Sequence, residues 1–182
     1  MKNINFDDYK KLVGNICRDI AKSNWRPDYV VGITRGGLLP AVMISHYFSV
    51  PCHTLKVSLR DGDSDCESNC WMSEDAFGHI SKEINFADED PTDLLSEAIP
   101  KNILIVDDIN DTGATLNWIM TDWQSSCMPD DSYWEEVWNN NVKFAVIVDK
   151  LSSKCRVGMD YVGLETEEDI WINFPYENWW SQ

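Results

Sequence analysis

Apolar and polar positions follow two periods along the first part of the chain and predict helices separated by short strands. Between residues 4 and 24, apolar side chains recur at steps of three and four, which is typical of an amphipathic helix. After a turn at 25–28, residues 29–33 form an apolar, β-branched run of the kind that is buried in a parallel sheet. An apolar helix is predicted at 38–48 and a second strand at 51–57.

The same alternation returns in the second half of the chain. Residues 103–106 predict a fully apolar strand, 107–112 a polar loop and 113–123 a helix, and further strands are predicted at 142–148 and 161–164. Because buried strands alternate with helices, we predict an α/β fold with a mostly parallel central sheet flanked by helices.

Two stretches follow neither period. Residues 58–100 are rich in Asp, Glu and Ser, and we predict an inserted, partly mobile excursion there, with room for a hairpin of its own. Residues 124–141 form a second excursion, in which 133–138 fits a short helix. The chain contains no internal repeat and no linker that divides it, so we expect a single domain over residues 1–182.

Composition narrows the class of protein. The 182 residues fit one ordinary domain, and 15 basic against 31 acidic residues give a net charge of −16. This balance argues against a nucleic-acid-binding surface, since phosphate backbones attract Lys and Arg. No apolar run approaches the roughly 20 residues of a membrane span, and the N-terminus lacks the apolar stretch of a signal peptide. We therefore expect a cytoplasmic protein whose six cysteines are reduced thiols.

The stretch 103–115, with the sequence ILIVDDINDTGAT, carries the most informative chemistry. Asp107 and Asp108 follow the apolar strand at its carboxyl end, where open α/β sheets bind ligands. The helix that starts next offers free N–H groups and a positive dipole end, which bind phosphate, and Gly113 lets the backbone approach closely. A phosphate at the helix start, with carboxylates before it to accept hydrogen bonds from vicinal hydroxyls, suits a ribose phosphate.

Taken as a whole, this stretch resembles the 5-phosphoribosyl 1-pyrophosphate (PRPP) motif of the type I phosphoribosyltransferases: four apolar residues, two acids, two variable positions and Asp-Thr-Gly-x-Thr. The alternative is that Asp111 or Thr112 only caps the helix beside a solvated acid pair. The resemblance implies that Asp107 and Asp108 meet the ribose hydroxyls and that Asp111 takes the N7 proton from a purine. It also implies a 5′-phosphate cradle made of Asn110, Asp111, Thr112, Gly113, Ala114 and Thr115.

The segment 31–40, VGITRGGLLP, fits the family's pyrophosphate loop after the first strand. It is most similar to the xanthine-guanine branch, where Ser-Arg-Gly-Gly-Leu occurs at this place. Two glycines allow unusual backbone dihedral angles, and the arginine and the backbone N–H groups suit an anion. The resemblance implies pyrophosphate binding by Thr34, Arg35, Gly36 and Gly37, whereas alone this sequence predicts a structural turn.

A strand-end lysine and a tryptophan extend the resemblance to the base. In similar purine enzymes the lysine after this strand, here Lys150, donates to the 6-oxo group; with donors only, it disfavours the amino group of adenine. Segment 169–177 resembles Trp-Ile-x-x-Pro-Trp of xanthine-guanine enzymes, with Tyr176 in place of the second tryptophan. This implies base stacking on Trp171 and a backbone contact from Ile172. The alternatives are a snorkelling surface lysine and a core tryptophan.

The resemblance implies a purine-salvage enzyme that transfers the 5-phosphoribosyl group from PRPP to a 6-oxopurine (guanine, xanthine or hypoxanthine) and releases pyrophosphate. It further implies a small base-binding hood at 160–182, a homo-oligomer (dimer or tetramer), and Mg²⁺ held by Asp107 and Asp108 directly or through PRPP and water. Ser58 and Arg60 are candidates for contacting PRPP. The alternatives are a catalytically silent PRPP- or nucleotide-binding sensor and phosphoribosyl transfer to a non-purine base.

Overall fold

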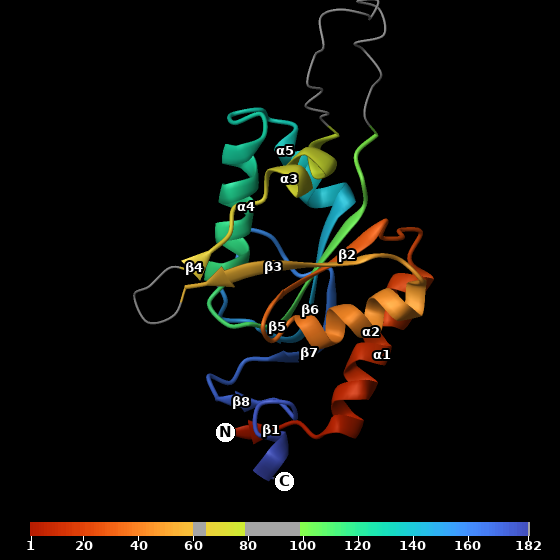
Figure 1. The fold of residues 1–182 in the computed structure, drawn as a ribbon. Coiled ribbons are helices and arrows are strands. Elements are labelled where there is room, and N and C mark those ends of the chain that lie inside the picture. Colours follow the sequence, from red (N-terminus) through yellow and green to blue (C-terminus); the bar gives the residue numbers. More distant parts are fainter. Residues whose placement is uncertain (60–64, 79–98, 182) are drawn as a thin grey trace, which may run out of the picture.

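The computed structural model describes residues 1–59, 65–78 and 99–181. Figure 1 shows a central sheet between two layers of helices, with the two termini close together below it. In chain order the elements are β1 (Lys2–Asn3), α1 (Phe6–Lys22), β2 (Tyr29–Thr34), α2 (Leu38–Phe48), β3 (Cys52–Ser58), β4 (Asp65–Cys66), α3 (Cys70–Phe77), β5 (Ile103–Asn110), α4 (Ala114–Ser126), α5 (Trp134–Glu136), η2 (Val137–Asn141), β6 (Val142–Lys150), β7 (Tyr161–Thr166), β8 (Ile172–Asn173) and η3 (Trp179–Ser181).

The main sheet has the strand order β4-β3-β2-β5-β6-β7. β3, β2, β5, β6 and β7 run parallel, and β4 lies antiparallel to β3 at one edge. The register sets Val31 of β2 beside Ile105 of β5, and Ile105 beside Phe144 of β6. This architecture confirms the predicted α/β fold, a mostly parallel sheet flanked by helices.

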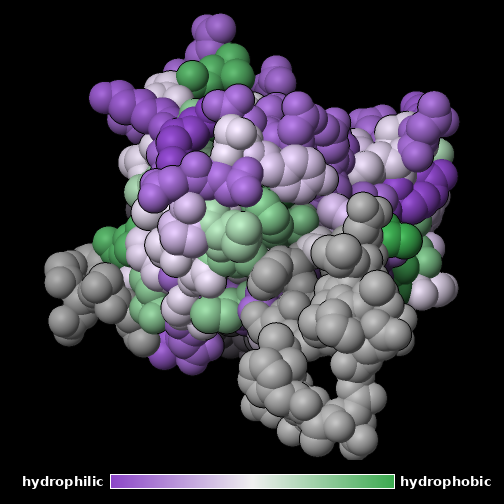
Figure 2. Space-filling view, turned by 90° about the horizontal axis from the view of Figure 1, so that it is seen from above, coloured by the Kyte–Doolittle hydropathy of each residue, from purple (hydrophilic) through white to green (hydrophobic). Residues whose placement is uncertain are grey.

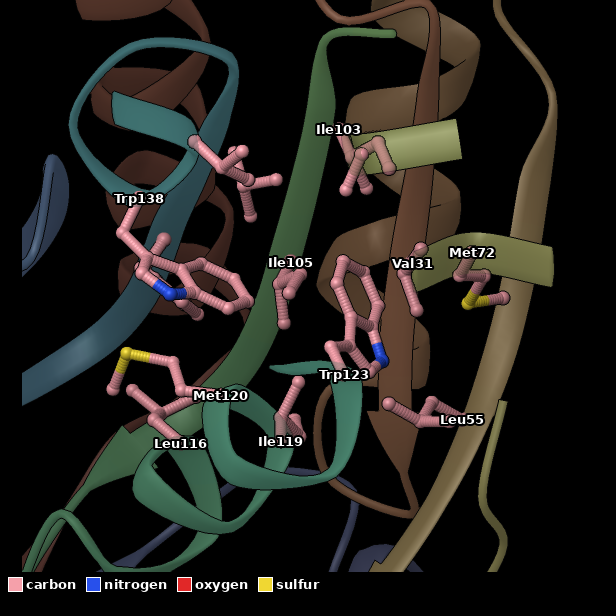
Figure 3. Close-up of a cluster of buried hydrophobic side chains, with 14 of the residues drawn as sticks. Val31, Leu55, Met72, Ile103, Ile105, Leu116, Ile119, Met120, Trp123 and Trp138 are labelled. Atoms are coloured by element: carbon pink, nitrogen blue, oxygen red, sulfur yellow. The ribbon is translucent and has the colours of Figure 1, made fainter. Parts of the chain in front are cut away.

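The two faces of the sheet are buried in two separate cores. On the side covered by α3 and α4, the rings of Trp123 and Trp138 lie around Ile105 (Figure 3). On the opposite side Leu104 belongs to a cluster with Ile16 of α1 and Ile44 of α2, and all three are fully buried. Because successive residues of a strand face opposite sides, burial of both faces explains why the central strands are continuous apolar runs.

Strands β5 and β6 are longer than the hydrophobic pattern predicted. β5 continues to Asn110, so Asp107 and Asp108 belong to the strand and not to a polar loop. The extension pairs with β6, where Asn110 lies beside Asp149, and β6 itself continues to Lys150. Apolar runs could not reveal this extension, because ladder hydrogen bonds use backbone groups and tolerate polar side chains.

The described part of the 58–100 excursion contributes to the fold. β4 pairs antiparallel with β3, the sheet strand that precedes this region, whereas the hairpin considered for the region was one of its own. α3 buries Met72 and Ala76 in the core beside α4. The sequence pattern missed this helix, because its eight residues give too few repeats of a helical period. The rest of the predicted excursion, residues 60–64 and 79–98, lies outside the described residues.

The second excursion, 124–141, forms α5 and the π-helix η2, which overlap the short helix predicted at 133–138. Trp134 and Val137 are buried, and the indole N–H of Trp134 donates a hydrogen bond of 3.0 Å to the Cys127 carbonyl oxygen. This segment therefore closes one end of the core.

The two ends of the chain meet in a small second sheet. β1 pairs parallel with β8, and Lys2 lies beside Ile172. The backbone N–H of Ile4 donates to the Asn173 carbonyl oxygen at 3.0 Å. The segment 160–182, expected to form a hood, is thus divided: β7 belongs to the main sheet, and β8 is joined to the N-terminus. The sequence pattern did not predict β1.

One face of the molecule shows how polar and apolar residues are distributed on the surface. Figure 2, which views the molecule from above, shows a largely hydrophilic surface with smaller hydrophobic areas. Within the described ranges, no helix combines the length and the apolar character that crossing a membrane requires. All six cysteines are free thiols.

Candidate functional site

A pocket of about 720 Å³ opens at the carboxyl ends of β2, β3 and β5. This edge of a parallel sheet is where α/β proteins bind ligands. The pocket brings together four parts of the chain that are far apart in the sequence. Its lining consists of residues 33–36, 57–59 and 107–116 with Tyr176, Glu177 and Trp180.

Asp107 and Asp108 line this pocket, and both residues are half-buried. The Asp107 carboxylate accepts a hydrogen bond of 2.9 Å from the backbone N–H of Asp108. One carboxylate oxygen of Asp108, Oδ2, accepts a hydrogen bond of 2.7 Å from the hydroxyl of Tyr176. Because β5 extends through both residues, the sheet itself fixes their backbone. The two carboxylates are therefore fixed acceptors for hydroxyl groups.

The N-terminus of α4 forms a second wall of the pocket. Gly113 caps the helix with a φ of 83°, in the left-handed region, and a Cβ there would overlap with the backbone of Cys155. The hydroxyl of Thr112 accepts a hydrogen bond of 3.3 Å from the Ala114 N–H. The first N–H groups of a helix have no acceptor within it, and its dipole is positive at this end. This wall suits a phosphate, with Thr115 half-buried beside it.

The side chain of Asn110 is used within the protein. Its amide donates 2.8 Å to Asp149 Oδ1, and its oxygen accepts 2.9 Å from the Ser153 hydroxyl. Burial raises the pKa of Asp149, although the hydrogen bond from Asn110 opposes the shift. The Asn110 side chain therefore links the end of β5 to the end of β6 and to the loop after β6. Its backbone groups are the part that can bind a ligand in the pocket.

The predicted pyrophosphate loop faces the acid pair. The peptide bond between Thr34 and Arg35 is cis, and Arg35 is exposed at the pocket. A Cβ on Gly36 would overlap with the carboxylate of Asp108, and a Cβ on Gly37 would overlap with the Val106 carbonyl oxygen. Both glycines are thus required by the close approach of β5. Thr34, Arg35 and Gly36 line the pocket, whereas Gly37 is buried and is the N-cap residue of α2.

Lys150 is almost fully buried and lies next to Asp111. Its ammonium is 2.6 Å from Asp111 Oδ1 and 3.2 Å from Asp169 Oδ1. Its side chain is 8% exposed, whereas those of Asp111 and Asp169 are 50% and 95% exposed. The hydrogen bond to Asp111 is the main cause that raises the pKa of Lys150, so the lysine stays charged. Asp111 lines the pocket and connects Lys150 to it.

None of the three predicted base-binding residues, Lys150, Trp171 and Ile172, belongs to the pocket lining. Trp171 is 62% exposed, and Ile172 is buried in β8. The aromatic residues that do line the pocket are Tyr176 and Trp180. Sequence reasoning did not select Trp180, because nothing local separates it from the other tryptophans. Tyr176 departs from the family pattern, which has a tryptophan at this position, so the resemblance implies no role for it.

Of the two residues considered for contacting PRPP after β3, Ser58 lines the pocket and is exposed. Arg60 lies outside the described residues. The carboxyl end of β3 therefore contributes to the same pocket as the acid pair and the N-terminus of α4.

Comparison with known proteins agrees with this arrangement. A model of the phosphoribosyl transferase domain family matches residues 5–178. The chain is 21% identical over 198 residues to xanthine phosphoribosyltransferase 1 of Saccharomyces cerevisiae, which covers 96% of this chain and 88% of that protein.

Solved structures share the fold. A purine phosphoribosyltransferase from Pyrococcus horikoshii Ot3 has a TM-score of 0.61 at 21% identity, over 97% of this chain and 94% of that one. The xanthine-guanine-hypoxanthine phosphoribosyltransferase of Helicobacter pylori has a TM-score of 0.64 at 16% identity, over 99% and 95%. Since the family model spans nearly the whole sequence, and the pocket joins the motifs that suggested it, this chain belongs to the phosphoribosyl transferase domain family.

Proposed function

We propose that this protein transfers the 5-phosphoribosyl group from PRPP to a 6-oxopurine and releases pyrophosphate. One observation carries the proposal: the acid pair, the N-terminus of α4 and residues 34–36 of the predicted pyrophosphate loop meet at one pocket. These three parts match the three parts of PRPP, which are a ribose with vicinal hydroxyls, a 5′-phosphate and a pyrophosphate.

Each part of PRPP has a chemically suitable partner. The 5′-phosphate would accept hydrogen bonds from the backbone N–H groups at the start of α4, next to the Thr112 hydroxyl. The ribose hydroxyls would donate to Asp107 and Asp108. The pyrophosphate would meet Arg35 and the backbone of its loop. No covalent nucleophile is needed, because positioning and charge stabilisation promote loss of the pyrophosphate.

The base would be recognised by Lys150 and Asp111. Lys150 would donate to the 6-oxo group, and Asp111 would accept the proton that leaves N7. These two groups lie 2.6 Å apart in the structure and contact each other directly. A bound purine would replace this contact, because its edge would bind to both side chains. The amino group of adenine would oppose the lysine donor with another donor, which favours 6-oxopurines. Stacking on Trp171 and a backbone contact from Ile172 stay part of the proposal.

The names of the relatives support the same substrates. The Saccharomyces cerevisiae relative is a xanthine phosphoribosyltransferase, and the Helicobacter pylori structure is named for xanthine, guanine and hypoxanthine. All three bases carry a 6-oxo group, which is the feature that Lys150 would recognise.

The residues of the pocket suit a Mg²⁺ ion that would be held partly by the protein and partly by PRPP. Asp107 and Asp108 supply carboxylates, but no cluster of three acidic, histidine or cysteine side chains suited to a metal exists in the described part of the chain. Mg²⁺ commonly takes one or two carboxylates and completes its shell with phosphate oxygens and water. Bound in that way, it would neutralise charge on the departing pyrophosphate.

The proposal includes a cytoplasmic homo-oligomer, a dimer or a tetramer. Sedimentation equilibrium of the purified protein tests this part, and a monomer at micromolar concentration would contradict it. The transfer activity is independent of this result, because the described pocket is formed within one chain.

A steady-state assay tests the transfer. PRPP and Mg²⁺ are supplied with guanine, xanthine, hypoxanthine or adenine separately, and nucleotide formation is followed. We expect turnover with one or more 6-oxopurines and none with adenine. Binding of PRPP without turnover on any base would contradict the proposal and favour a sensor protein.

A further inference from the structure

The hydroxyl of Tyr176 connects three segments that are far apart in the sequence. It donates a hydrogen bond of 2.7 Å to Asp108 Oδ2 and lies 3.4 Å from the Gly36 carbonyl oxygen. Asp108 belongs to the acid pair, Gly36 to the pyrophosphate loop, and Tyr176 to the tail after β8. The tail is therefore tied directly to both parts of the pocket that would hold PRPP.

Packing holds the Tyr176 ring independently of its hydroxyl. The ring stacks on Phe174 with centroids 5.6 Å apart and an interplanar angle of 3°. The ring of Tyr9, from α1, meets it edge-on at 5.8 Å. Both neighbours are almost completely buried. Removal of the hydroxyl alone would thus leave the ring in place, because the aromatic contacts do not involve it.

The hydrogen bond to Asp108 has a fixed direction. Burial and the negative charge of Asp108 raise the pKa of Tyr176, so its hydroxyl stays protonated and donates. This bond fixes one oxygen of the Asp108 carboxylate, Oδ2, and a carboxylate has further lone pairs that can accept from another group. On the other side, Gly36 is so close that a Cβ would overlap with the same carboxylate. Tyr176 and Gly36 together determine the orientation of Asp108.

We propose that Tyr176 is a positioning residue for PRPP, which acts by holding the Asp108 carboxylate in the orientation that accepts a ribose hydroxyl. This inference rests on the proposed function, since it assigns PRPP to the pocket. Tyr176 thereby sets the affinity for PRPP, while recognition of the base depends on Lys150, which it does not contact.

The variant Tyr176→Phe tests this role. A hydrogen bond to a charged group contributes enough free energy that we expect about a ten-fold rise in the KM for PRPP. The KM for the purine should stay within about two-fold of the parent value, since Lys150 and Asp111 are untouched. A purely structural role would lower the thermal stability without separating the two KM values.

Tyr161→Phe is a matched control. The Tyr161 hydroxyl also has a partner, Ser23 Oγ at 3.2 Å, but it lies at the start of β7, away from the pocket. We expect Tyr161→Phe to keep both KM values. If Tyr176→Phe also keeps the parent KM for PRPP, the inference is wrong.

A double-mutant cycle with Asp108→Asn tests whether Tyr176 acts through Asp108. If it does, Tyr176→Phe should have a smaller effect in the Asp108→Asn background than in the parent protein. Equal effects in both backgrounds would overturn the inference. Isothermal titration of PRPP in the presence of Mg²⁺ measures the dissociation constant of PRPP for each protein of the cycle without turnover. The positioning role can therefore fail or stand independently of the proposed transfer reaction.

Discussion

The ammonium of Lys150 lies 2.6 Å from Asp111 Oδ1, at the point where the end of β6 meets the loop before α4. We propose that both residues bind the purine: Lys150 as the donor to its 6-oxo group and Asp111 as the acceptor of its N7 proton. Asp169, from the segment between β7 and β8, lies 3.2 Å from the same ammonium. Lys150 is therefore held between two acids from separate segments.

Replacement of Lys150 should change base selectivity. Lys150→Met keeps the apolar stem and removes the donor, so we expect kcat/KM for hypoxanthine and guanine to fall roughly 100-fold, with the KM for PRPP little changed. Lys143→Met is the control, because Lys143 pairs with Asp160 at the other end of β6. A Lys150 variant with the parent's preference among the four bases would remove its assigned role.

Asp111 should be needed for the chemical step. Asp111→Asn keeps the shape of the side chain but cannot accept the proton, so we expect kcat to fall about 100-fold or more. The dissociation constant of PRPP, measured by titration, should change only slightly. Asp169→Asn is the matched control, because it removes the charge of the other acid beside Lys150. The Asp169 side chain is 95% exposed. An equal loss of kcat in both variants would argue against a proton acceptor at Asp111.

Glycine at position 36 should be required for PRPP binding. A Cβ at Gly36 would displace the carboxylate of Asp108, so Gly36→Ala should raise the KM for PRPP by about ten-fold or more. Gly158→Ala provides the comparison, since a Cβ there meets no atom within 4 Å. Steady-state kinetics and thermal melting of both variants decide the matter. An unchanged KM for PRPP in Gly36→Ala would show that Asp108 does not need its observed position.

Asp149 should make folding stability depend on pH in the acidic range. Burial raises its pKa above the ordinary value of 3.8, so the folded state binds more protons than the unfolded chain between the two pKa values. The contribution of Asp149 to the free energy of unfolding therefore falls as pH rises through this interval. We expect Asp149→Asn to gain stability relative to the parent as pH rises above 3.8, measured by urea unfolding. A pH-independent difference would contradict the burial effect.

Local patterns in the sequence were enough to predict the fold class and to place the acid pair at the end of a strand and before a helix. Apolar runs such as 29–33 and the helical spacing within 4–24 reflect burial, which acts locally along the chain, so β2 and α1 were predicted within a few residues. The acid pair and the start of α4 were predicted for the same reason, because a strand end, a glycine and a helix N-terminus are consecutive in 103–115.

Contacts between distant segments could not be predicted from local patterns and became visible with the packed fold. The bond from Tyr176 to Asp108, the pairing of β1 with β8 and the use of the Asn110 side chain by Asp149 each join residues far apart in the sequence. No local period encodes such contacts, since they depend on how the layers pack. Trp180 lines the pocket and Trp171 does not, for the same reason. The residues next to a tryptophan in the sequence do not show which surface its segment packs against.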